Sequence, residues 1–62
     1  MKVREVIKLL EENGWYQVKG GKGSHRKFKH ADFTNTIIVP GNLGDDMPIG
    51  TLNNILKAAG LK

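Results

Sequence analysis

Two histidines, His25 and His30, are the only side chains in this 62-residue chain whose ordinary titration falls near neutral pH. A group that gains and loses a proton there can act as a general acid or base. His25 directly follows residues 20–24, a run of three glycines, one lysine and one serine. Small residues let a phosphate approach the main chain, so this segment indicates phosphate chemistry beside His25.

Positive charge is concentrated around His25. The chain has a net charge of +4, and no acidic residue stands between Glu12 and Asp32. That interval holds Lys19, Lys22, Arg26, Lys27 and Lys29. A block of one sign in a small fold focuses a positive potential, and nucleic acid is the commonest polyanionic partner. A solvated basic face without a ligand stays open as the alternative.

RNA cleavage is the reaction that this combination favours. Internal attack needs a base for the 2′-hydroxyl proton and positive charge to stabilise the phosphorane, and His25 with basic neighbours can supply both without a metal. The predicted RNA-binding residues are Lys22, Gly23, Ser24, Arg26, Lys27 and Lys29. His30 and Lys22 are candidates for protonating the leaving 5′-oxygen. The alternative is that His25 only contacts phosphate or solvent.

Other chemistries find little support in the sequence. The absence of cysteine excludes disulfides, thiolate metal sites and a thiol nucleophile. The two histidines do not have the spacing of a helical His-x-x-x-His metal pair, and Asp45-Asp46 is typical of solvated loop acids. Ser24 lacks a carboxylate-oriented base, and the glycine run does not match a P-loop. We expect no metal and no cofactor.

The elements that position His25 follow from apolar spacing. Val3, Val6, Ile7 and Leu10 predict a helix at about 2–13 that Gly14 ends. Strand-forming residues predict strands at 15–18, 24–29 and 36–39, with turns at 19–23 and 30–35.

A second helix is predicted after Pro48 and before Gly60, with Thr51 as its N-cap if it starts late. Its apolar stripe is Ile49, Leu52, Ile55, Leu56 and Ala59. Leu61 stands where a Schellman ending places a hydrophobic contact.

The order of elements predicts an α+β fold, a single domain over residues 1–62. Short connections indicate an antiparallel three-stranded sheet, and both amphipathic helices must cover the same face to share a core. If Phe28 points into that core, strand alternation places His25, Lys27 and Lys29 on the open face. Trp15 is interpreted as a core anchor. Without a membrane-spanning run or a signal-peptide core, the protein is expected in the cytoplasm.

Several segments, in order and spacing, resemble the HicA family of messenger-RNA-cleaving toxins. They are Gly14-Trp15, Lys22-Gly23-Ser24-His25, Val39-Pro40-Gly41-Asn42 and the closing run from Pro48 to Leu61. The resemblance implies a fold like that of double-stranded-RNA-binding domains and a metal-independent ribonuclease acting on messenger RNA. It also implies His25 as the catalytic histidine, Gly23 and Ser24 as its shaped approach, and a HicB-type antitoxin as partner.

One stretch departs from the family pattern. Relatives carry lysines before the last helix, whereas residues 44–51 here are acidic or apolar. We therefore expect phosphate binding to fall more heavily on the segment from Lys19 to Lys29. A non-catalytic RNA-binding or adaptor module that uses the same basic face remains the alternative function.

Overall fold

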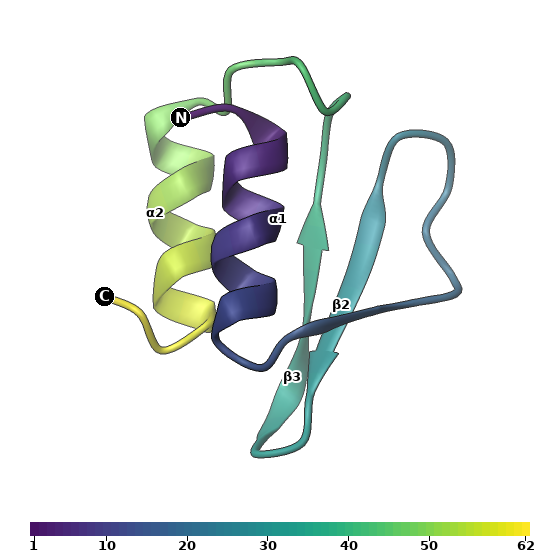
Figure 1. Cartoon of the computed structure of the whole chain (residues 1–62), viewed down its shortest axis with the longest axis vertical. Helices are drawn as coiled ribbons and strands as arrows, with labels where there is room; N and C mark the ends of the chain where they lie inside the picture. Colours follow the sequence, from purple (N-terminus) through teal and green to yellow (C-terminus); the bar gives the residue numbers. More distant parts are fainter.

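The computed structural model describes all 62 residues as two layers, a sheet and a pair of helices (Figure 1). The elements are α1 (Val3–Glu12), β1 (Tyr16–Val18), β2 (Arg26–His30), β3 (Phe33–Val39) and α2 (Ile49–Ala58). The predicted α+β fold is confirmed: the chain forms a helix, a three-stranded antiparallel sheet and a second helix, in that order.

The sheet has the order β1-β2-β3, which leaves β1 and β3 as edge strands. Phe28 in the central strand lies opposite Gln17 on one side and Ile37 on the other. Phe28, Ile37 and Val39 are buried on the face that the helices cover, while Ile38 between the last two is 45% exposed. Side-chain alternation therefore separates a core face from an open face.

One core joins both helices to the sheet. It consists of 11 buried residues: Val3, Val6, Leu10, Trp15, Phe28, Ile37, Val39, Met47, Leu52, Ile55 and Ala59. Trp15 is 2% exposed, which confirms its interpretation as a core anchor. Neither helix has the length and apolar character needed to cross a membrane.

The C-terminal ends of both helices have the same hydrogen-bonding pattern. Beyond α1, Gly14 N–H donates to the Glu11 carbonyl (3.2 Å) and Trp15 N–H to the Leu10 carbonyl (3.0 Å). These bonds form a Schellman ending that carries Trp15 into the core. Leu61 N–H bonds the Leu56 carbonyl in the same way at 2.9 Å, which confirms the predicted ending.

Strand boundaries differ from the prediction by one residue at the start of β1 and at the end of β2, and by more at the starts of β2 and β3. The second strand begins at Arg26, because Ser24 and His25 belong to a turn in which His25 N–H donates to the Lys22 carbonyl at 3.0 Å. The third strand begins at Phe33, three residues early, so residues 33–35 are strand and not turn. The Phe33 ring packs at a centroid distance of 5.0 Å from Trp15, which extends the strand.

The second helix begins earlier than a Thr51 cap requires. Leu52 N–H donates to the Pro48 carbonyl (2.9 Å), so Pro48 is the N-cap and Thr51 lies in the first turn. The late start that a Thr51 cap would need does not occur. Ile49, predicted in the apolar stripe, is 72% exposed. Met47 enters the core from the preceding loop instead, at 6% exposed.

The loop between β3 and α2 is held to the start of α1. Val3 N–H donates to the Asp45 carbonyl (2.9 Å) and Arg4 N–H to the Leu43 carbonyl (3.1 Å). The Asp45 carboxylate accepts the Asn42 N–H at 3.0 Å. The loop thereby satisfies helix N–H groups that would otherwise lack partners.

Replacing Gly14 with Ala should destabilise the fold. Gly14 has φ +89°, and a Cβ built on it would lie 2.6 Å from His30 Nε2. We expect Gly14→Ala to lower the free energy of unfolding by about 1–3 kcal/mol, because it combines backbone strain with a clash. Urea unfolding measures this change. Gly44→Ala, whose added Cβ meets nothing within 4 Å, is the control and should change little. Equal midpoints for the two variants would contradict the prediction.

Candidate functional site

His25 lies at the entrance to β2, between the glycine-rich loop and the strand. Its backbone is fixed by the bond from its N–H to the Lys22 carbonyl, whereas its side chain is exposed. Neither ring nitrogen has a hydrogen-bond partner within the chain, in contrast to both nitrogens of His30. The ring of His25 is therefore free to exchange a proton with a bound molecule.

The loop between β1 and β2 folds back onto the main chain of His25. A Cβ built on Gly21 would lie 2.0 Å from the His25 carbonyl oxygen and 2.9 Å from its carbonyl carbon. Only glycine fits this close approach. Gly21 was not singled out from the sequence, where it is one of three similar glycines in the run.

Arg26 holds this loop from the core side of the sheet. It alternates with Phe28, and its Nη1 donates to the Ser24 carbonyl (3.1 Å) and the Gly41 carbonyl (3.0 Å). The half-buried guanidinium thus ties the residue before His25 to the segment that follows β3. Arg26 also lines a polar hollow that Lys19 and Lys27 line.

Lys27 and Lys29 point away from Phe28 to the open face. Lys27 lies opposite Val18 and Ile38, and Lys29 lies opposite Tyr16. A Cβ on Gly20 would lie 3.4 Å from Lys27 Nζ, so the Lys27 side chain extends across the glycine-rich loop.

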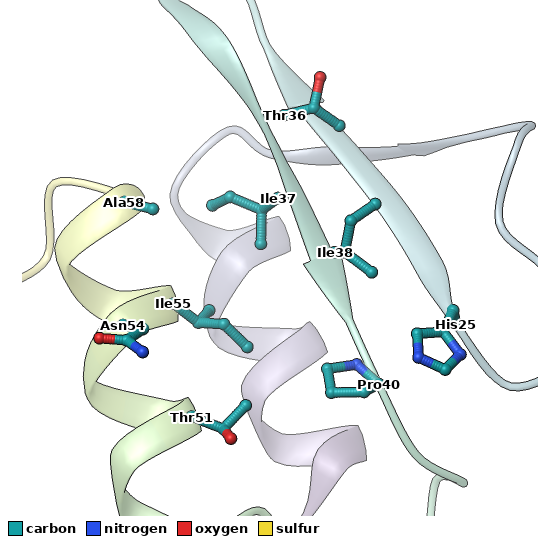
Figure 2. Close-up of a pocket in the computed structure, with 9 residues that line it drawn as sticks. All are labelled: His25, Thr36, Ile37, Ile38, Pro40, Thr51, Asn54, Ile55 and Ala58. Atoms are coloured by element: carbon teal, nitrogen blue, oxygen red, sulfur yellow. The ribbon is translucent and has the colours of Figure 1, made fainter.

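Two hollows meet at His25. A polar hollow of about 440 Å³ lies under the loop and is lined by Gln17, Lys19, Gly23 and Lys27 among others. A second hollow of about 400 Å³ crosses β3 from His25 to α2 (Figure 2). His25 lines both. A molecule bound across both hollows would pass over the imidazole.

The other histidine is fully engaged in the fold. His30 Nε2 lies 2.9 Å from the Asn13 carbonyl, and Asp32 N–H donates to His30 Nδ1 at 2.9 Å. A carbonyl only accepts and an N–H only donates, so this pair of bonds requires Nε2 as the donor and Nδ1 as the acceptor. The ring also packs edge-on against Trp15 and Phe33 at centroid distances of 5.2 and 4.9 Å.

His30 is too remote to share a phosphate with His25. His25 precedes the first residue of β2 and His30 is its last residue, so the length of the strand lies between them, at about 3.3 Å per residue. Both ring nitrogens of His30 are engaged within the chain, so the structure gives no support to His30 as the leaving-group acid. Lys22 is exposed in the loop and remains a candidate.

No carboxylate pairs with the basic segment, residues 19–29. The one salt bridge in the structure joins Lys2 to Asp46 at 3.6 Å, and Asp45 is occupied by the Asn42 N–H. The lysines of residues 19–29 form no ion pair, so their charge is directed to solvent. No three His, Cys, Asp or Glu side chains gather as a metal-holding group.

The fold and this site define a class: a small α+β protein that presents one free histidine beside unpaired lysines. The model of the HicA toxin of bacterial toxin–antitoxin systems matches residues 3–61, and the chain belongs to this family. It is also similar to a solved toxin–antitoxin complex from Streptococcus pneumoniae, with 36% identity, a TM-score of 0.82 and 98% of each chain covered. A search of curated proteins found no match.

Removing the Arg26 side chain should loosen the loop that carries His25. Arg26→Ala deletes two charge-assisted hydrogen bonds, so we expect a loss of about 1–2 kcal/mol in the free energy of unfolding. Amide hydrogen exchange at His25 N–H should also accelerate, because its turn loses the tether. Lys29→Ala, on the same strand but exposed, is the control and should leave both unchanged. Unaltered exchange in Arg26→Ala would show that the loop does not depend on this tether.

Proposed function

We propose that this protein is the toxin of a HicA/HicB-type system, a metal-independent endoribonuclease that cleaves messenger RNA and arrests translation. The observation that carries the proposal is the free imidazole of His25 at the junction of a lysine-lined hollow and a second groove. Membership of the HicA toxin family supports the same function. The cytoplasm, where messenger RNA is translated, is the compartment in which it would act.

The reaction follows from one histidine with positive charge beside it. Neutral His25 takes the proton of the 2′-hydroxyl, and the 2′-oxygen forms a bond to phosphorus. The bond from phosphorus to the 5′-oxygen breaks, which leaves a 2′,3′-cyclic phosphate and a 5′-hydroxyl. The leaving oxygen takes its proton from the His25 imidazolium or from the Lys22 ammonium. When His25 returns the proton, its neutral imidazole is restored; when Lys22 donates it, the proton held by His25 passes to solvent and Lys22 takes one back from solvent.

Phosphate binding is assigned to the basic segment before and within β2. Lys22, Lys27 and Lys29 supply charge, while Gly23 and Ser24 allow the RNA backbone to approach the main chain. The first turn of α2 has no basic residue, and Asp46 is paired with Lys2. We therefore assign phosphate binding mainly to residues 19–29, where Arg26 also lines the polar hollow and holds the loop.

A HicB-type antitoxin is the protein partner that we assign to this toxin. Support comes from the similarity to a chain of the toxin–antitoxin complex from Streptococcus pneumoniae. An antitoxin that covers His25 and the open face would block both hollows at once.

His25→Ala should remove cleavage and leave the fold intact. A positioned acid–base group contributes on the order of 100- to 10,000-fold in rate, so we expect at least a 100-fold loss. Incubation of purified protein with RNA, followed by mapping of RNA ends, measures it, and circular dichroism checks the fold. Lys57→Ala, at an exposed lysine in the last turn of α2, is the control with full activity. Cleavage by His25→Ala at the wild-type rate would refute the assignment, and loss of wild-type activity in EDTA would refute metal independence.

Lys27→Ala and Lys29→Ala should each weaken RNA binding by a salt-dependent amount. Removing one lysine–phosphate interaction should reduce the slope of log K against log salt by roughly 0.7 for single-stranded RNA. Lys8→Ala on α1 is the control with an unchanged slope. The non-catalytic alternative predicts this same salt dependence with RNA left intact after long incubation, so the cleavage assay separates the two functions.

A further inference from the structure

The groove that crosses β3 has a composition unlike that of the lysine-lined hollow. Apart from His25, its lining carries no ionisable side chain. Ile38 and Pro40 present apolar surface, and Thr51 and Asn54 of α2 present a hydroxyl and an amide (Figure 2). We propose that this groove is a nucleoside subsite, which takes the base and ribose adjoining the cleaved phosphate and sets the preferred cleavage site. The inference rests on the proposed ribonuclease function.

The shared position of His25 gives the groove its direction. An RNA chain that is cleaved at an internal phosphate extends away from the catalytic group in two directions. The lysine-lined hollow suits the charged backbone on one side, whereas an uncharged lining suits a base and a ribose. Because His25 lines both hollows, a chain that fills them in turn brings the phosphate between them to the imidazole.

Asn54 is the side chain best suited to read a base. An amide offers an acceptor and two donors, the set that pairs with a base edge. Asn35 and Asn53 are both committed within the fold, the first to the Ala58 carbonyl and the second to Lys62. Asn54 is exposed, lines the groove and makes no hydrogen bond within the chain. Its amide is therefore available to a ligand.

The groove is preformed and of suitable size. Its volume of about 400 Å³ falls in the range of small-molecule sites, which is roughly 300–1,000 Å³. Its base is built on Ile37 and Ile55, which are 3% and 6% exposed and belong to the core. A groove with such a base keeps its shape without a ligand, so a nucleoside would bind without reorganising the fold.

Asn54→Ala tests the inference in the cleavage assay. We expect the relative use of cleavage sites to change by about tenfold, the scale of one base contact, while total cleavage persists. Asn53→Ala, the neighbouring asparagine outside the groove, is the matched control with the wild-type pattern. Ala58→Gln places a longer side chain in the groove and should raise KM more than it lowers kcat. An unchanged pattern in Asn54→Ala together with an unchanged KM in Ala58→Gln would overturn the inference while the ribonuclease function stands.

A binding experiment provides a readout that does not need activity. Non-cleavable 2′-O-methyl pentamers of A, C, G and U are titrated against the wild-type chain and followed by NMR. We expect the Asn54 side-chain amide to shift, with one pentamer binding at least a few-fold more tightly than the others. This result in a protein that fails to cleave RNA would support nucleoside binding in the groove but refute the ribonuclease, and with it a role of the groove in choosing cleavage sites. Shifts confined to residues 19–29 would overturn the subsite, and so would groove variants that weaken only inhibition by the antitoxin.

Discussion

Burial of Phe28 is the constraint on which the arrangement of the basic segment depends. Its side chain is fully buried at the centre of the sheet, opposite Gln17 and Ile37. Burying a phenylalanine contributes about 2–3 kcal/mol, far more than an exposed lysine gains from any orientation. A shift of one residue in register would expose Phe28 and bury its two lysine neighbours. The core therefore fixes Lys27 and Lys29 on the open face and turns Arg26 toward the helices.

The two histidines show how the same side chain takes different roles according to its neighbours. His30 lies at the end of β2 where α1 and the β2–β3 turn meet, so it finds a carbonyl of one and an N–H of the other. Trp15 and Phe33 then enclose its ring. His25 stands at the opposite end of β2, where Arg26 and the turn bonds hold only the backbone. The His30 imidazole at one end of β2 therefore stabilises the fold, whereas the His25 imidazole at the other end remains available to a ligand.

Much of the fold was predictable from apolar spacing, because helix and strand periods differ and each helix ends at a glycine. Contacts between residues that are distant in the sequence were not predictable in this way. The early start of β3 depends on Phe33 meeting Trp15 and His30, and no local pattern in residues 30–35 encodes that meeting. Likewise, alternation placed the lysines correctly, but His25 lies before the strand. The surroundings of His25 come from Gly21 and from the groove residues of α2. These α2 residues are separated from His25 in the sequence by about half the chain.

His25 is the one histidine of this chain whose ring nitrogens make no hydrogen bond within the fold, and the proposed catalysis depends on it. Without a second free imidazole beside His25, the proposed reaction depends strongly on where the phosphate is held and on the positive charge beside it. The position of the phosphate and of the charge both depend on the β1–β2 loop. Gly21 lets this loop approach the main chain of His25 closely, and Arg26 ties the loop to the Gly41 carbonyl. The anchor is made to backbone atoms, so it fixes the loop while leaving the imidazole and the lysines uncommitted. Rigidity of the main chain and freedom of the side chains at this site thus have the same structural origin.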